Sequence, residues 1–181
     1  MTAQPHDPEL ERIRAALATV HDPEIPALSV VDLGIVRAIT RAGDGTPVVR
    51  LTPTYTGCPV AALIEWAVRR ALDAAGFAHA RIETVLSPPW STADITEEGR
   101  RRLREAGIAP PVEREDEEGF FCEDPAVPCP RCGSQDTEKV SEFGATACKA
   151  LWRCRSCREP FEYFKCVPRL RLRRGAETPA G

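Results

Sequence analysis

The sequence predicts an α+β protein, in which a small α/β sandwich precedes a small β ribbon that binds a metal. Two observations indicate this class. Helical and strand-like patterns alternate in the first half of the chain, and two Cys-x-x-Cys pairs flank a strand-like run in the second half. We expect four segments: a small α/β domain over 8–106, an acidic, proline-rich linker over 107–128, a four-cysteine zinc ribbon over 129–166 and a basic, disordered tail over 167–181.

The first domain is expected to open with a helix that ends near Val20. Asp7 is a suitable N-cap, and Pro8 suits the first helical turn. Apolar residues then recur at helical spacing until two prolines forbid continuation. A hairpin follows, with strands over 35–40 and 48–52 around a glycine-containing turn at 43–45.

The second helix is expected over 59–75. Gly76 marks its end, because glycine readily takes the left-handed conformation that closes helices. A strand over 81–86 and a helix over 96–106, capped by Thr96, complete the domain. The residues expected in the buried stripe of the second helix are Val60, Leu63, Ile64, Ala67 and Ala71.

The ribbon is expected to hold one metal ion. A gap of two residues lets both thiolates of a pair turn toward one ion, and a second pair completes a tetrahedron, which Zn²⁺ fits. Two disulfides, or a rubredoxin-like iron site of the same geometry, are the alternatives. Gly133 supplies the permissive backbone that a tight metal knuckle needs. The expected ligands are Cys129, Cys132, Cys154 and Cys157.

The composition predicts a cytoplasmic protein with neither nucleic acid nor a membrane as its partner. The chain has 181 residues and a formal net charge of -3, which gives no reason to expect nucleic acid. Its amino terminus is polar, and no apolar run approaches transmembrane length. Thiols stay reduced in the cytosol, which favours metal over disulfides. The cysteines outside the metal set are Cys58, Cys122, Cys148 and Cys166.

Two of these cysteines belong to the ribbon. Cys148 and Cys166 either line its hydrophobic side, together with Phe143, Trp152 and Phe161, or offer thiols to a partner.

A second chemical centre is expected at Cys58. If Pro59 is the first helical position, Cys58 is the N-cap, where free backbone N–H groups and the helix dipole favour the thiolate. Such a thiolate can bind iron or an iron–sulfur cluster transiently. The alternative is a small buried hydrophobic residue. Asp22 and Glu24 either approach the same site or simply form the turn after the first helix.

Three runs of residues resemble the iron–sulfur assembly family, which includes bacterial SufT-like proteins and cytosolic iron–sulfur targeting factors. The resemblance covers residues 8–86 and implies a small α/β domain. The runs are His21-Asp-Pro-Glu-Ile-Pro26, Ser29-Val-Val-Asp-Leu-Gly34 and Leu51-Thr-Pro-Thr-Tyr-Thr-Gly-Cys-Pro59.

Further motifs extend the resemblance, over nearly the full length, to the PaaD (also PaaJ) family of accessory proteins in phenylacetyl-CoA epoxidase systems. The chain departs from that pattern at 91–95, where a second tryptophan is expected after Trp90. The motifs are Ser87-Pro-Pro-Trp90, Gly107-Ile-Ala-Pro-Pro111, Phe143-Gly-Ala-Thr-Ala-Cys-Lys-Ala150 and Cys157-Arg-Glu-Pro-Phe161.

The resemblance implies an accessory role in a multicomponent monooxygenase of aerobic phenylacetate breakdown. Its expected partners are the di-iron oxygenase and the reductase, which holds flavin and a [2Fe–2S] cluster, and a homo-oligomer is left open. The accessory protein would assist maturation by delivering iron or an iron–sulfur cluster, and no catalytic residue is expected. The residues agree, since no histidine has the Glu-x-x-His spacing of di-iron sites. A rubredoxin-like electron-transfer protein is the alternative.

Overall fold

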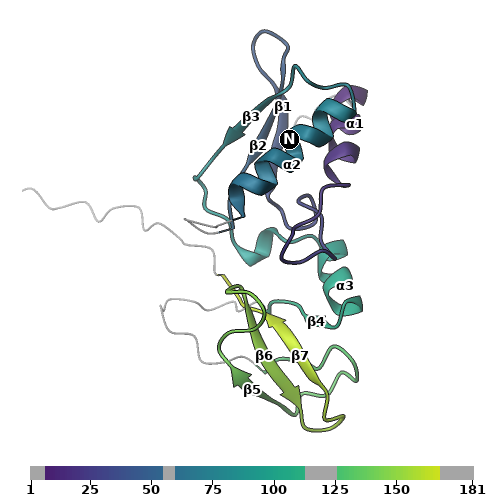
Figure 1. The fold of residues 1–181 in the computed structure, drawn as a ribbon, viewed down its shortest axis with the longest axis vertical. Helices are drawn as coiled ribbons and strands as arrows, with labels where there is room; N and C mark the ends of the chain where they lie inside the picture. The colour runs from purple at the N-terminus through teal and green to yellow at the C-terminus, as the bar shows by residue number, and fades with distance from the viewer. Residues whose placement is uncertain (1–6, 55–59, 113–125, 168–181) are drawn as a thin grey trace, which may run out of the picture.

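The computed structural model describes residues 7–54, 60–112 and 126–167, which form two small sheets with helices (Figure 1). The first sheet carries the helices of the α/β domain, and the second is the ribbon. The α+β class expected from the sequence is confirmed. None of the helices in these ranges is long and apolar enough to cross a membrane.

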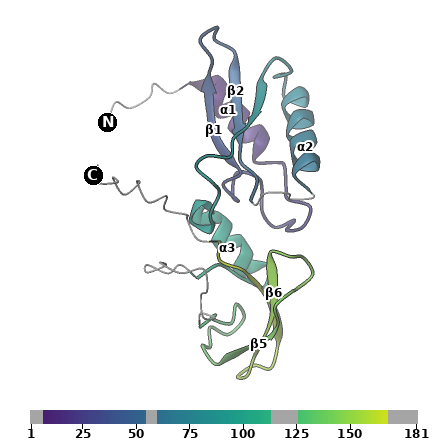
Figure 2. The same ribbon diagram turned by 90° about the vertical axis from the view of Figure 1, so that its left-hand side faces the viewer.

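The first domain is a two-layer sandwich. Its sheet has the order β1-β2-β3, in which β1 and β2 are antiparallel and β3 runs parallel to β2. Helices α1 and α2 cover the same face of this sheet (Figure 2), and apolar residues of both layers form one core. The bounds are α1 Pro8–Leu17, β1 Val36–Arg41, β2 Pro47–Leu51, α2 Ala61–Ala74 and β3 Arg81–Thr84.

Helix α1 begins where the sequence predicts and ends earlier. Asp7 is the N-cap, and its Oδ1 accepts hydrogen bonds from the backbone N–H groups of Glu9 at 3.0 Å and Leu10 at 3.4 Å. The helix ends at Leu17, and the N–H of Val20 donates to the carbonyl oxygen of Leu17 at 3.0 Å. The last expected turn is therefore a tighter, non-α turn.

Helix α2 differs from the expectation at its start and on its buried face. It begins at Ala61 with Val60 as the N-cap. The buried residues follow each other at spacings of four: Ile64, Val68 and Leu72. Leu63, expected in the stripe, is 49% exposed, because it directly precedes Ile64 and therefore faces another side of the helix. The expected end is confirmed, since Gly76 has a φ of +87°.

Helix α3 (Glu97–Glu105) joins the first domain to the ribbon, and the short 3-10 helix η1 (Thr92–Asp94) precedes it. Thr96 caps α3 by accepting from the N–H of Gly99 at 3.0 Å, as expected. Asp32 fixes the helix on the first domain. Its carbonyl oxygen accepts from the N–H of Thr96 at 2.9 Å, and its carboxylate accepts from Arg102 at 3.1 Å.

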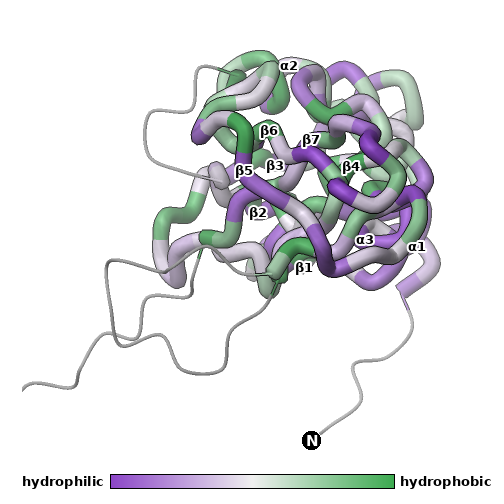
Figure 3. The backbone as a smooth tube through the Cα atoms, turned by 90° about the horizontal axis from the view of Figure 1, so that it is seen from below, coloured by the Kyte–Doolittle hydropathy of each residue, from purple (hydrophilic) through white to green (hydrophobic). Residues whose placement is uncertain are grey.

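The ribbon sheet has the order β4-β7-β6-β5. Strand β4 lies within the segment expected to be linker, yet it pairs parallel with β7, so the ribbon sheet recruits backbone that directly follows α3. Strand β5 is an edge strand of mainly hydrophilic residues (Figure 3), which protects the edge against pairing with other chains. The bounds are β4 Ile108–Ala109, β5 Thr137–Ser141, β6 Lys149–Cys154 and β7 Pro160–Phe164.

The ribbon has its own small core. Trp152 packs edge-on against Tyr163, with ring centroids 6.0 Å apart, and Phe161 is buried beside them. Phe143, which we expected on this hydrophobic side, is 64% exposed and lies under the ammonium group of Lys165.

Candidate metal centre

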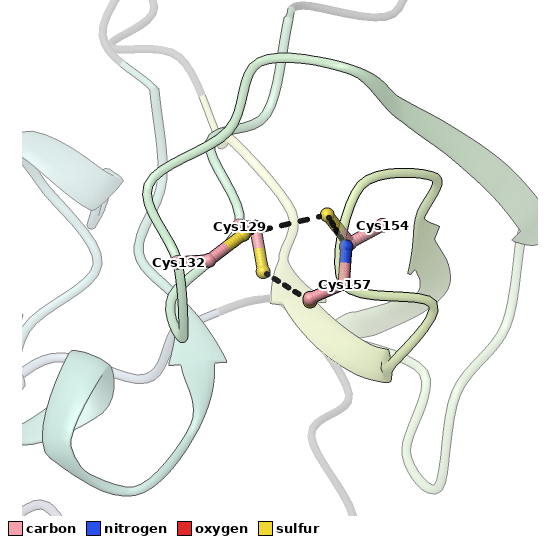
Figure 4. A group of neighbouring side chains, drawn as sticks. All are labelled: Cys129, Cys132, Cys154 and Cys157. Carbon is pink, nitrogen blue, oxygen red and sulfur yellow. Dashed lines mark hydrogen bonds between the residues drawn. The ribbon is translucent and has the colours of Figure 1, made fainter.

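Four thiols converge at one end of the ribbon (Figure 4). The Sγ atoms of Cys129 and Cys157 lie 3.8 Å apart, and those of Cys132 and Cys154 lie 3.6 Å apart. All four Sγ atoms lie within 4.8 Å of one another. The structure therefore brings together all four residues that the sequence predicts as ligands.

The two Cys-x-x-Cys turns have matching backbone geometry. In the first, the N–H of Gly133 donates to the carbonyl oxygen of Cys129 at 2.9 Å, and Gly133 has a φ of +75°. In the second, Arg158 occupies the equivalent place after Cys157 and has a φ of +66°. Both turns thus require a left-handed residue after the second cysteine. In the second turn this residue is Arg158, and an arginine does not by itself predict a left-handed conformation.

The sulfur spacing suits a tetrahedral metal ion. A tetrahedron with metal–sulfur bonds of about 2.3 Å has sulfur–sulfur edges of about 3.8 Å. The observed 3.8 Å and 3.6 Å match these edges and far exceed the roughly 2.05 Å of a disulfide bond. The four cysteines are free thiols, so the disulfide alternative does not fit the structure. Both zinc and iron fit this donor set.

One thiol of the set is already activated by the backbone. The N–H of Cys157 donates to the Sγ of Cys154 at 3.4 Å, and this hydrogen bond, together with those of the neighbouring Cys157 and Cys132 thiols, lowers the pKa of the Cys154 thiol to about 6. A thiol with such a pKa is largely a thiolate near neutral pH, which is the form that binds metals. The ribbon backbone thus prepares at least one ligand for a cation.

The second expected centre is only partly described by the structure. Cys58 lies outside the described residues, and so does Cys122. The expectation that Cys58 caps α2 is wrong, because Val60 is the N-cap and the first α-helical hydrogen bond runs from the N–H of Ile64 to the carbonyl oxygen of Val60 at 2.9 Å. A role for the Cys58 thiol therefore cannot rest on that cap position.

The two acids expected beside Cys58 have different environments. Asp22 is buried, and its Oδ1 accepts from the backbone N–H groups of Glu24 at 2.8 Å and Ile25 at 2.9 Å. It therefore holds the turn after α1, as one of the two expectations had it. The carboxylate of Glu24 is instead directed at the ribbon, where the Cys148 thiol lies 4.0 Å from its Oε2. These residues are 124 positions apart, so no local pattern could have predicted the contact.

Comparison with known proteins finds two family models that match successive parts of the chain. A family model described as an iron–sulfur cluster assembly protein matches residues 10–83, and one described as the PaaD zinc beta ribbon domain matches residues 113–165. A crystal structure of a domain of unknown function, DUF59, from Bacillus anthracis has a TM-score of 0.47 and 28% identity, over 51% of this chain and 89% of that chain.

Two relatives cover different extents of the chain. A putative 1,2-phenylacetyl-CoA epoxidase subunit of the PaaD type, from Escherichia coli (strain K12), is 47% identical over 163 residues, which are 88% of this chain and 94% of that protein. The Fe-S protein maturation auxiliary factor YitW of Bacillus subtilis (strain 168) is 35% identical over 82 residues, which are 45% of this chain and 79% of that protein.

Fold, cysteine site and family models together define an iron–sulfur assembly domain joined to a zinc ribbon domain. Within that class, the chain belongs to the PaaD family of 1,2-phenylacetyl-CoA epoxidase subunits. The resemblance inferred from the sequence motifs is confirmed.

Proposed function

We propose that this protein is a non-catalytic accessory subunit that assists the maturation of an iron-containing component of a phenylacetyl-CoA epoxidase system. The observation that carries the proposal is the 47% identity to the Escherichia coli epoxidase subunit over 88% of the chain. The similarity of the first domain to a protein described as an Fe-S protein maturation auxiliary factor supports maturation as the task. Its partners are then the oxygenase or the reductase, in the cytoplasm, where thiols stay reduced.

The ribbon metal in this proposal is structural zinc. Cys129, Cys132, Cys154 and Cys157 would hold it, and when bound it would cross-link the two Cys-x-x-Cys turns. Four thiolates without an open position suit a structural ion rather than a catalytic one. The small core of the ribbon supports the same conclusion, because a sheet of this size gains much of its stability from the metal.

Iron or an iron–sulfur cluster is the cargo, and we assign its transient binding to Cys58, with Glu24 as a further oxygen ligand and Asp22 in support. A single thiolate can release what four would retain, and carboxylate oxygens can complete the coordination of iron. Asp22 contributes by holding the turn that carries Glu24.

The test is co-production of the epoxidase components with this protein, with Cys58→Ala or with Cys122→Ala as the matched cysteine control. We expect Cys58→Ala to lower the iron content and turnover of the oxygenase or the reductase, and Cys122→Ala to leave both unchanged. Addition of the variant to fully assembled enzyme should make no difference. Normal iron content and turnover with Cys58→Ala would overturn the proposal.

A further inference from the structure

The β6–β7 hairpin connects the metal centre to the first domain. Cys154, a metal ligand, is the last residue of β6, and Cys148 immediately precedes the first residue of that strand. Strand β7 returns antiparallel, with Pro160 paired to Arg153, next to Cys154, and Phe164 at the far end. We call residues 146–149 and 164–167 the docking end of the ribbon, because they reach the first domain (Figure 1).

The docking end is attached to the first domain by apolar packing. Phe164 is 3% exposed and belongs to the core of the first domain rather than to that of the ribbon. Its ring lies 6.4 Å from the ring of Trp90, whose Nε1 donates to the carbonyl oxygen of Leu33 at 2.8 Å. A ribbon side chain is thereby built into the first hydrophobic core.

Hydrogen bonds to one buried threonine reinforce this attachment. The N–H of Thr92 donates to the carbonyl oxygen of Val167 at 3.0 Å. The Thr92 hydroxyl lies 3.2 Å from the same oxygen, 3.3 Å from the N–H of Val167 and 3.5 Å from the Sγ of Cys166. Thr92 is 2% exposed, so these bonds are sheltered from water.

The same docking end contacts Glu24. Cys148 packs against the core of the first domain, with its Sγ 4.0 Å from the Oε2 of Glu24 and 3.0 Å from the hydroxyl of Thr146. Its carbonyl oxygen accepts from the N–H of Lys165 at 3.0 Å, which fixes the residue to the returning strand. The position of this thiol therefore depends on an intact hairpin.

We propose that the metal-bound ribbon acts as a clamp, in which the metal at Cys129, Cys132, Cys154 and Cys157 holds the docking end against the first domain and keeps Cys148 over Glu24. A small ribbon without its metal loses order, because metal binding and folding are coupled. Loss of the metal then releases the docking end and exposes both the thiol and the carboxylate. The inference depends on metal in the ribbon, and not on iron handling by Glu24.

The coupling must act in both directions, because linkage between two sites is reciprocal. A weaker docking end should therefore hold the metal less well. Thr92→Val keeps the side-chain shape but removes the hydroxyl bonds to Val167. Val140→Ala is the matched control, since Val140 lies on the same ribbon, is 56% exposed and belongs to neither core.

The experiment measures the apparent zinc affinity of the full-length protein by equilibrium competition with a chromogenic chelator. We expect the apparent dissociation constant for zinc to be about fivefold higher for Thr92→Val than for the unchanged protein, the low end of usual coupling strengths, and unchanged for Val140→Ala. Phe164→Leu, which removes the ring contact with Trp90, should act like Thr92→Val and replaces it if that variant does not fold. Equal zinc affinities for a folded docking-end variant and the control would overturn the clamp.

A second measurement follows Cys148 itself. Site-resolved alkylation by iodoacetamide, quantified by mass spectrometry, should be slow in the zinc-loaded protein and fast after zinc is chelated. In Thr92→Val the zinc-loaded protein should already react faster. If Cys148 reacts at the same rate with and without zinc, the docking end stays in place without the metal, and the proposal is wrong. Neither measurement involves iron, so its outcome is separate from the test of the maturation role.

Discussion

A Cβ atom on Gly34 would lie 2.2 Å from the carbonyl oxygen of Asp94. The turn that ends at Gly34 thus touches the backbone of the segment that leads into α3. Gly34 also has a φ of +70°, which L-residues other than glycine rarely adopt. The glycine of the Ser29–Gly34 motif is therefore required twice, by its backbone conformation and by close packing of the first domain on the connection to the ribbon.

Gly34→Ala should destabilise the first domain severely. The left-handed backbone alone costs about 1–2 kcal/mol, and the overlap with backbone at Asp94 forces a further shift, for a total above about 3 kcal/mol. Gly45→Ala is the matched control, since Gly45 has a φ of +82° with no atom within 4 Å of the added Cβ. Urea denaturation followed by circular dichroism should show a loss of about 1 kcal/mol for the control. If both variants lost the same unfolding free energy, the close approach of Gly34 to Asp94 would contribute nothing to stability.

Asp32→Ala should cost about 2–4 kcal/mol of unfolding free energy. The Oδ2 of Asp32 accepts from the N–H and the hydroxyl of Ser29, at 3.1 Å and 2.7 Å, and from Arg102 at 3.1 Å. The substitution leaves the buried N–H and hydroxyl of Ser29 without this acceptor, while Arg102 keeps its ion pair with Glu98. Asp73→Ala removes only an exposed carboxylate that pairs with Arg69, and should change stability by less than about 0.5 kcal/mol. Thermal unfolding of the two variants compares the losses, and a similar shift in both would contradict the role of Asp32.

The sequence predicts those features that depend on local chemistry. The cap at Asp7, the end of α2 at Gly76 and the convergence of the four cysteines all follow from residue type and spacing, and the structure agrees. The start of α2 is predicted less well. Pro59 suits a first helical turn, yet α2 begins at Ala61, because proline tolerates that position without requiring it.

Contacts between distant segments could not be predicted in this way. Phe164 and Cys148 lie on the ribbon, and their apolar character is equally suited to the ribbon core or to the first domain. Which core each residue joins depends on how the ribbon lies against the first domain. The spacing of apolar residues along a strand does not encode that arrangement. The contact between Cys148 and Glu24 also joins the ribbon to the first domain, so local sequence patterns do not predict it.

Cys132→Ser should abolish zinc binding and disorder the ribbon while the first domain stays folded. Three thiolates and a hydroxyl bind zinc far more weakly than four thiolates, and folding of the ribbon depends on the metal. Elemental analysis of the purified protein gives the metal content. Cys166→Ser is the control, since Cys166 lies beside Thr92 and away from the four-thiol set, and should retain full zinc. Iron with an intense thiolate charge-transfer colour in the unchanged protein would instead favour the rubredoxin-like alternative.

The pKa of the Cys148 thiol should lie above its usual range. Burial raises the pKa of Cys148, the hydrogen bond with Thr146 lowers it, and the carboxylate of Glu24 raises it, with a net increase. A raised pKa means that less thiolate is present at a given pH. Alkylation of Cys148 in the zinc-loaded protein should therefore be slow at pH 8 and should accelerate with a midpoint above that of an ordinary thiol.

Two substitutions should move this midpoint in opposite directions. Glu24→Gln removes a negative charge beside the thiol, so the pKa should fall and alkylation at pH 8.5 should become faster. Thr146→Val removes the hydroxyl at 3.0 Å that favours the thiolate, so the pKa should rise and alkylation should become slower. Site-resolved rates across pH 7.5–10.5 provide both midpoints. If Glu24→Gln leaves the midpoint in place, Glu24 does not face Cys148 in solution, because a carboxylate at this distance must influence the thiolate.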